Sequence, residues 1–397
     1  MFPVHRIKNW ARAHDANCLV SSTSFQQENF LKITSIEAVP FTIPYQHPIV
    51  AASGVLDSAE HVLVRVHTDE GLVGIGEAAS RSFVYGESQA SIVAAIRQWL
   101  EPALIGADPM AVEDLYERTS WLVANNTARG ALDIALHDLR GKVTGMPSWL
   151  LLGGVKRPVR VTRILTMGEA QEAADEARQA VAESGISSFK VKVGTGLRSD
   201  VARIAAVREA VGEEATIYVD ANHGWRAEEA ILALTSMAEY GLDLVEEPCP
   251  ASDTIGRQRL AQHIPISIMA DESAPTLADA ARELTAGSAR ALSIKTTRTG
   301  FTESARLVSL AGALGARTLL GSQADSMVGT AASLAFGSAF PQVASEPGEL
   351  DYFNVFTDHL VTNELVVQNG VLIPSELPGI GVEIDEDKLC HYRIDNR

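Results

Sequence analysis

Residues 188–222 read SFKVKVGTGLRSDVARIAAVREAVGEEATIYVDAN, which is a short apolar strand, a helical segment and a second short apolar strand. The same alternation continues on both sides, from VRVTRIL at 159–165 to ARTLLGSQ at 316–323, and makes seven strand-and-helix units in series. Serial units of this kind indicate a parallel sheet with right-handed crossovers, and seven or eight of them favour a closed barrel. The sequence therefore predicts an α/β fold with a (β/α)7β barrel of the TIM type, and we expect an eighth strand between Gln342 and Leu350.

The segments that flank the barrel have a different pattern. LKITSIEAVPFTI at 31–43 alternates like a strand, and a hairpin is expected around Gly71. Helical periodicity follows between Ser88 and Gly145. We therefore expect an α+β capping domain built from the N-terminal segment and the C-terminal tail. The expected boundaries are an extension at 1–30, the cap at 31–155, the barrel at 156–360 and a C-terminal segment at 361–397 that returns to the cap.

Composition excludes several classes of function. The chain of 397 residues carries 33 Lys and Arg against 50 Asp and Glu, and its formal net charge of −17 disfavours nucleic acid as a partner. No uncharged apolar run approaches the roughly 18 residues that a membrane span requires, so we expect a cytoplasmic protein with no membrane partner. Cys18, Cys249 and Cys390 have neither the spacing of a zinc site nor that of a disulfide framework.

Charged residues stand where the apolar strands of the barrel end. Strands two to six end in Lys190 and Lys192, Asp220 with Asn222, Glu246 and Glu247, Asp271 and Glu272, and Lys295. Successive strand ends are about one strand-and-helix unit apart. Because the C-terminal ends of the strands form the active-site face of such a barrel, these side chains are expected to meet at one mouth.

Three of these carboxylates predict a metal site. Asp220, Glu246 and Asp271 come from neighbouring strands and would repel one another without a counter-ion. Oxygen ligands on three sides, with positions left open for water and substrate, suit Mg2+, with Mn2+ as a possible substitute.

The lysines predict proton transfer. Lys192 and Lys295 flank the metal position, and Lys190 alternates onto the same face as Lys192. Nearby positive charge and partial burial would lower the pKa of a lysine toward the range of a base at neutral pH. Two such lysines around a cation suit the removal or delivery of a proton α to a carboxylate, with the metal stabilising the enediolate.

These residues resemble the enolase superfamily, and within it the mandelate racemase and muconate lactonizing enzyme (muconate cycloisomerase) subgroup. The resemblance is carried by GIGEA, SFKVKVG, VDANHGW, LVEEP, MADES, SIKTTRTG and PGIGVEID. It implies that Asp220, Glu246 and Asp271 bind Mg2+, and that Lys192 and Lys295 form the acid/base pair with support from Lys190. It also implies a homo-oligomer, and cap loops near Ser53 and Tyr85 that select a small carboxylate substrate.

The activity within the subgroup is left open by the sequence. YGESQASI favours a muconate-type cycloisomerase. The alternatives are a racemase or epimerase of N-acylamino acids or dipeptides, a dehydratase of sugar acids or hydroxy acids, and a non-catalytic, metal-stabilised binding barrel. Glu349 and Asp351 loosely resemble the D-x-D by which dipeptide epimerases hold an ammonium group. Further candidate substrate contacts are Asn222, Ser322, Gln323 and Asp325, the last standing where a glutamate is usual in the family.

Overall fold

The computed structural model describes residues 31–51 and 54–395. The expected extension at 1–30 and the candidate substrate contact Ser53 lie outside these residues. The expected boundaries between the cap, the barrel and the C-terminal segment remain predictions. Within the described ranges, no helix combines the length and the apolar character needed to cross a membrane.

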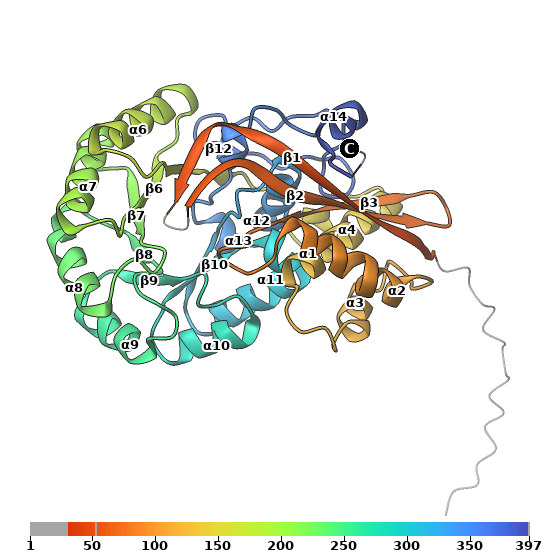
Figure 1. Cartoon of the computed structure of the whole chain (residues 1–397), viewed down its shortest axis with the longest axis horizontal. Coiled ribbons are helices and arrows are strands. Elements are labelled where there is room, and N and C mark those ends of the chain that lie inside the picture. The colour runs from red at the N-terminus through yellow and green to blue at the C-terminus, as the bar shows by residue number, and fades with distance from the viewer. Residues whose placement is uncertain (1–30, 52–53, 396–397) are drawn as a thin grey trace, which may run out of the picture. The chain divides into compact units, whose positions relative to one another are not determined.

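Seven parallel strands form a curved sheet and confirm the predicted barrel fold, in the order β5-β6-β7-β8-β9-β10-β11. They are β5 (Thr162–Leu165), β6 (Ser188–Lys192), β7 (Thr216–Asp220), β8 (Leu244–Glu246), β9 (Ser267–Ala270), β10 (Ala291–Ile294) and β11 (Arg317–Leu320). Each is followed by a helix: α6 (Ala170–Ser184), α7 (Leu197–Val211), α8 (Ala227–Ser236), α9 (Thr254–His263), α10 (Leu277–Thr285), α11 (Thr296–Ala313) and α12 (Met327–Ala339). A 3-10 turn, Ala238–Tyr240, follows α8. The helices lie outside the ring of strands (Figure 1).

The eighth strand expected between Gln342 and Leu350 is reduced to a single bridging residue. Pro341 begins a short helix, α13 (Pro341–Ala344), where the fixed φ of proline suits the first helical position. Further on, only a single parallel bridge joins Gly348 to Val161. Glu349 N nevertheless donates to Leu320 O of β11 at 2.9 Å. Gly348 and Glu349 therefore form a short extended segment between β5 and β11. Pro347, which has no N–H, cannot extend this pairing toward the N-terminus.

The cap begins with an antiparallel sheet of β1 (Ile33–Ala51), β2 (Gly54–Thr68) and β3 (Val73–Ala79), whose second turn is the hairpin expected around Gly71. Its helices are α1 (Gln89–Ala95), a π-helical turn (Ile96–Leu100), α2 (Glu101–Leu104), α3 (Val112–Arg118) and α4 (Asn126–Thr144). β3 packs so closely on α4 that a Cβ at Gly74 or Gly76 would lie 2.1 Å from a carbonyl oxygen of α4. The glycines of GIGEA therefore permit this packing.

The C-terminal tail returns to the cap, as expected. Short elements lead to it: α5 (Ser148–Leu151), β4 (Val159–Arg160), the 3-10 turn Tyr352–Val355, β12 (Val371–Leu372) paired with β4, and α14 (Glu386–Tyr392). Asp138 of α4 accepts hydrogen bonds at 2.9 Å from the backbone N–H groups of Ile75 in β3 and Ile380 in the tail. It also lies 2.7 Å from Lys142 Nζ. One buried carboxylate therefore joins α4, β3 and the tail.

We predict that Asp138→Ala lowers the free energy of unfolding by about 2–4 kcal/mol, because two buried N–H groups lose their acceptor and Lys142 loses its partner. Urea unfolding at neutral pH measures this change. Asp175→Ala is the matched control, since the side chain of Asp175 is 62% exposed and its loss should cost less than about 0.5 kcal/mol. Equal losses in the two variants would contradict the role given to Asp138.

Candidate active site

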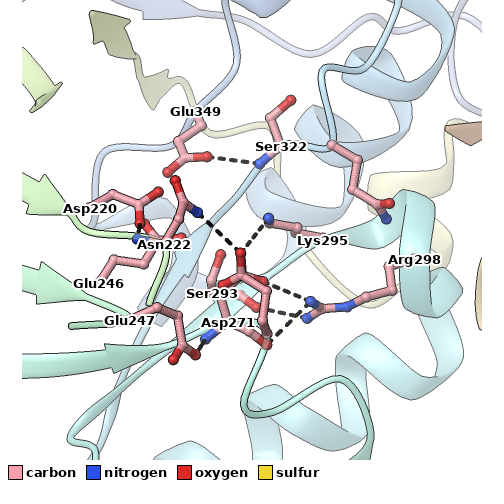
Figure 2. Close-up of polar contacts among 12 residues, drawn as sticks. Asp220, Asn222, Glu246, Glu247, Asp271, Ser293, Lys295, Arg298, Ser322 and Glu349 are labelled. Atoms are coloured by element: carbon pink, nitrogen blue, oxygen red, sulfur yellow. Dashed lines mark hydrogen bonds and ion pairs between the residues drawn. The ribbon is translucent and has the colours of Figure 1, made fainter. Parts of the chain in front are cut away.

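The charged strand ends lie together at one mouth of the barrel. Lys192, Asp220 and Glu246 are the last residues of β6, β7 and β8, and each is paired in register with the next. Asp271 and Lys295 directly follow β9 and β10. Figure 2 shows Asp220, Glu246, Asp271 and Lys295 gathered at these strand ends.

Lys190 is a buried cation surrounded by three carboxylates. Its Nζ lies 2.6 Å from Glu246 Oε2, 2.8 Å from Glu349 Oε1 and 3.0 Å from Asp220 Oδ2. The hydroxyl of Tyr218 donates to the same Glu349 oxygen at 2.8 Å. Burial alone would lower the pKa of Lys190, but the three carboxylates outweigh burial and raise this pKa well above its ordinary value. Lys190 is therefore held as an ammonium group that compensates its neighbours.

Lys192 is more accessible than Lys190. Its Nζ donates to Asp220 Oδ2 and to Asn222 Oδ1, both at 2.7 Å. Its side chain is 22% exposed, against 3% for Lys190. The Nδ2 of Asn222 donates to Glu272 Oε1 at 3.1 Å, which orients the amide so that its oxygen faces the amine. Lys192 is thus the lysine of this pair that a bound molecule can reach.

Lys295 belongs to a second cluster, centred on Asp271. Lys295 Nζ and Arg298 Nη1 lie 2.5 Å and 2.7 Å from the two oxygens of Asp271. The hydroxyl of Tyr85, from the cap, donates to Asp271 Oδ1 at 2.9 Å and accepts from Arg298 at 2.8 Å and from Lys295 at 3.2 Å. One cap side chain therefore contacts every charged group of this cluster, which places Tyr85 at the site where the resemblance expected a cap loop.

Charge at this mouth shifts the pKa values of its acids and bases. Burial would raise the pKa values of Asp220 and Asp271, yet the neighbouring cations hold both well below their usual range. Burial and the charge of Asp220 raise the pKa of Glu246 well above its ordinary value. For Lys295 the expected lowering is wrong in this structure: burial lowers its pKa, but Asp271 and its neighbours outweigh burial and raise it well above the ordinary value.

The backbone is strained at the same mouth. Asn222, His223, Glu247 and Ala324 have φ values of 40°, 64°, 37° and 58°, and each lies within four residues of the end of a barrel strand. Residues other than glycine rarely adopt this left-handed backbone conformation, and strained backbone of this kind is common at functional sites.

Glu246 provides a test of whether a cation fits the expected ligands. Its side chain is fully buried. Oε2 forms an ion pair with Lys190 Nζ at 2.6 Å, whereas Oε1 has no hydrogen-bond partner among the residues that the structure describes. A buried carboxylate oxygen without a partner is costly, and a divalent cation would remove that cost. The donor set of Asp220, Glu246 and Asp271, which is all oxygen, fits a hard cation such as Mg2+.

A second group of side chains could also hold a metal ion, and the sequence analysis assigned it no such role. Ligand atoms of His223, Glu247 and Glu272 lie within 4.8 Å of one another. The carboxylate of Glu247 is already engaged, however, by Arg257 at 2.9 Å and by the N–H and hydroxyl of Ser273 at 2.9 and 2.5 Å. Glu246 Oε1 in the expected group and Glu272 Oε2 in this one are both buried without a hydrogen-bond partner among the described residues, so each group keeps a carboxylate oxygen that a cation could take.

The other candidate substrate contacts lie on the far side of the mouth, and most of their polar atoms have protein partners. Ser322 N donates to Glu349 Oε2 at 2.9 Å. Asp325 Oδ1 accepts from Thr297 Oγ1 at 2.8 Å and from Gln323 N at 3.3 Å. Asp351 Oδ2 pairs with Arg163 Nε at 2.5 Å. The role of each of these residues in substrate binding remains a prediction.

Arg298 is the clearest residue to which the sequence analysis gave no role. It is fully buried and reaches from α11 to Asp271 (Figure 2). The only available signal was a charged residue one helical turn after Lys295, within SIKTTRTG. A charge in the first turn of a helix is more often on the surface, so its direction could not be read from the sequence.

Comparison with known families covers most of the chain. Residues 34–153 match the family described as mandelate racemase / muconate lactonizing enzyme, N-terminal domain. Residues 172–388 match the family described as enolase C-terminal domain-like.

Solved structures and curated proteins agree with these matches. A muconate lactonizing enzyme from Mycobacterium smegmatis, complexed with muconolactone, is 44% identical with a TM-score of 0.90, and the match covers 92% of this chain and 100% of that one. The N-succinyl-L-Arg/Lys racemase of Bacillus cereus is 32% identical over 92% of this chain and 98% of its own. A dipeptide epimerase from Enterococcus faecalis, complexed with Mg and the dipeptide L-Leu-L-Tyr, is 29% identical with a TM-score of 0.84, covering 89% and 99%.

We predict that Asp325 makes stability depend on pH. Burial, with the nearby charge of Glu77, raises the pKa of Asp325 to about 6 from an ordinary value of 3.8. The stabilising contribution of its neutral form is therefore complete below about pH 4 and is lost as the pH rises through about 6. Asp325→Asn should raise the free energy of unfolding at pH 7.5 by about 2–3 kcal/mol and leave it unchanged near pH 4.

Urea unfolding at the two pH values measures this difference. Asp175→Asn is the control, because its exposed carboxylate should leave the pH dependence of the wild type unchanged. If Asp325→Asn instead lowered stability at pH 7.5, the hydrogen bonds from Thr297 and Gln323 would be holding an ionised carboxylate.

Proposed function

The chain is an enzyme of the enolase superfamily and belongs to its mandelate racemase and muconate lactonizing enzyme family, and we propose that it is a muconate-type cycloisomerase. The reaction moves a proton at the carbon α to a carboxylate. The observation that carries this proposal is the pair of lysines, Lys192 and Lys295, at strand ends on either side of three buried carboxylates.

Asp220, Glu246 and Asp271 are the proposed Mg2+ ligands, with Mn2+ as a substitute. The unpartnered Oε1 of Glu246 supports this assignment, and so does the Mg complex of the dipeptide epimerase. When bound, the cation would hold the substrate carboxylate and stabilise the negative charge of the enediolate. Asp220 and Asp271 each already face a lysine, so substrate bound at this position would lie between the two amines.

The chain's own residues then complete the cycloisomerisation. One carboxylate oxygen of the muconate adds to a carbon of its conjugated double bonds, a C–O bond forms, and the electron pair moves to the α carbon. Lys192 delivers its proton there, which gives the lactone, and the neutral amine that is left regains a proton from water. Asn222 orients the Lys192 amine, while Lys190 keeps the surrounding carboxylates compensated. Tyr85 and Arg298 hold Lys295 and Asp271 in place.

A racemase of N-acylamino acids is the second candidate, in which Lys192 and Lys295 serve opposite faces of one carbon. The similarity to the N-succinyl-L-Arg/Lys racemase supports it. A dipeptide epimerase is less favoured, because it needs free carboxylates for an ammonium group. Glu349 is occupied by Lys190 and Tyr218, and Asp351 by Arg163. A dehydratase would use the same two lysines, so their presence does not distinguish it. A non-catalytic barrel would not require both lysines.

Proton NMR in D2O with Mg2+ tests the proposal on a panel of muconates, muconolactone, N-acylamino acids, dipeptides and sugar acids. We predict lactone formation from a muconate and deuterium at the α carbon of muconolactone. In Lys192→Ala both rates should fall by about 100-fold or more, the size expected for loss of a general acid. Lys156→Ala is the control, since this lysine is 37% exposed and pairs with Glu376.

The other results of this experiment are also decisive. Exchange at an N-acylamino acid that is lost in both Lys192→Ala and Lys295→Ala would establish the racemase instead. Full activity in Lys192→Ala, or no reaction across the panel while Mg2+ binds, would reject the proposed function.

We predict that Glu246→Gln weakens Mg2+ binding by at least about tenfold. Loss of a residue that only contacts a metal ligand typically lowers the affinity by about this factor, and loss of a ligand itself should lower it no less. Titration calorimetry measures the affinity. Glu272→Gln is the matched variant, as it changes the alternative group of His223, Glu247 and Glu272 and should alter the affinity less. The reverse order of effects would move the metal to that group.

The remaining expectations concern the cell and the assembly. Cytoplasmic localisation, a small carboxylate as the partner and a homo-oligomeric state are part of this proposal. The muconolactone bound to the related Mycobacterium smegmatis enzyme supports the substrate class.

A further inference from the structure

Arg81 lies at the rim of the barrel mouth, at the start of the cap loop that carries Tyr85. The N–H of Tyr85 donates to Arg81 O at 2.9 Å, so the two residues belong to one tight turn. The hydroxyl of Tyr85 contacts both Asp271 and Lys295, at 2.9 and 3.2 Å. Arg81 is therefore held within one turn of chain of a residue that touches the catalytic cluster.

The strand that leads into Arg81 is also bound to the mouth. The carboxylate of Glu77 in β3 accepts from Ser326 N at 2.9 Å. In the orientation that satisfies both polar atoms of the Gln323 amide, its nitrogen donates to Ala79 O at 3.3 Å. Gln323 and Ser326 belong to the loop that follows β11. Contacts on both sides of Arg81 thus fix this residue over the strand ends.

The side chain of Arg81 lies near Tyr45, Asp325 and Tyr352. Burial raises the pKa of each of these three groups, and the positive charge of Arg81 opposes the rise. The rings of Tyr45 and Tyr352 are in edge-to-face contact, with their centroids 6.4 Å apart. The charge of Lys190 acts on Tyr352 in the same direction as that of Arg81, so this tyrosine lies near both cations.

Arg81 differs from the other cations of the mouth in having no acid as a partner. Each of the others is paired with a carboxylate at 2.7 Å or less: Lys190, Lys192, Lys295 and Arg298. The Arg81 guanidinium is partly buried and donates to Ser80 O at 3.4 Å, and it forms no ion pair with any acid that the structure describes. The raised pKa of Asp325 agrees with this, because a direct ion pair would lower it.

A substrate with two carboxylates requires a cation at this position. Muconate has a carboxylate at each end of its conjugated chain, and only one of them can lie at the proposed metal ligands. The other would be repelled by the acids beside β11 unless an opposite charge accompanied it. The planar guanidinium of an arginine has donors for both oxygens of a carboxylate. Building on the proposed function, we propose that Arg81 binds the second carboxylate of a dicarboxylate substrate and so determines specificity for such substrates.

Two unreactive probes of equal length test the proposal without any turnover. Adipate carries a carboxylate at both ends of its chain, and hexanoate carries one. Titration calorimetry with Mg2+ present measures the affinity of each probe. We expect the wild type to bind adipate about tenfold or more tightly than hexanoate, the effect of one charge-assisted contact. In Arg81→Met this preference should disappear through loss of adipate affinity alone, and Arg81→Lys should keep part of it.

Arg290→Met is the matched control. Arg290 is exposed and directly precedes β10, at the end of the barrel opposite the mouth. The substitution changes the net charge by the same amount as Arg81→Met, and it should leave both affinities as they are in the wild type.

Four results would overturn the proposal: no adipate binding, equal affinities of the wild type for the two probes, a preference that survives in Arg81→Met, or equal weakening of both probes in that variant. The last result would give Arg81 a structural role instead. Because neither probe reacts, this outcome is separate from that of the NMR experiment. Absence of lactone formation would reject the cycloisomerase, whereas the adipate preference and its loss in Arg81→Met would still establish the binding role of Arg81.

Discussion

The burial of several carboxylates at one mouth of the barrel is the constraint on which the rest of the structure depends. Asp220, Glu246, Asp271 and Glu349 are each at most 3% exposed. Buried charges of one sign are tolerated only with compensation. Lys190 supplies it for three of these acids, and Lys295 with Arg298 supplies it for Asp271. The positions of the lysines are therefore required by the acids before any substrate is considered.

The cap is attached to the barrel by the same means, with buried acids bound to backbone N–H groups. Glu77, in GIGEA of β3, accepts from Ser326 N at 2.9 Å and from Gly329 N at 3.1 Å, at the start of α12. Asp133 of α4 accepts from the N–H groups of Phe301 and Thr302 at 2.5 and 3.0 Å. These residues directly follow the kink at Gly300 and begin the second helical part of α11. A carboxylate is favourable at a helix N-terminus, so these contacts orient the cap over the mouth.

Asp133 also explains why glycine stands at position 300. At Gly300 φ is 69°, and a Cβ there would lie 2.5 Å from Asp133 Oδ2, so glycine is required. Phe301 is fully buried and packs against His137 and Phe336, with ring centroids 5.3 and 5.7 Å away. Phe301 therefore fills the interface between α4 and α11, and its apolar side chain is compatible with the fold.

The sequence predicts the barrel and the convergence at its mouth because both follow from periodicity and from a spacing that the topology repeats. Lys192, Asp220 and Glu246 needed no knowledge of packing to be placed together. Contacts between side chains of different helices or strands were not predictable, because they depend on the direction in which each side chain points. Arg298 lies in the first turn of α11, just before the kink at Gly300, and its direction toward Asp271 is set by the packing of that helix. The eighth strand is shortened at Pro341, which begins α13, and at Pro347, which has no N–H to pair.

The unequal surroundings of the two lysines bear most directly on the reaction. Lys192 is 22% exposed and pairs with Asp220 and a neutral amide, whereas Lys295 is 8% exposed and is held by Asp271 and Tyr85. A racemase needs two bases of similar strength on opposite faces, because each must both take and return a proton. A cycloisomerase needs one mobile proton donor and, opposite it, a fixed positive charge that stabilises the developing enediolate. An accessible Lys192 and an enclosed Lys295 match the second requirement, and the asymmetry thus favours chemistry on one face.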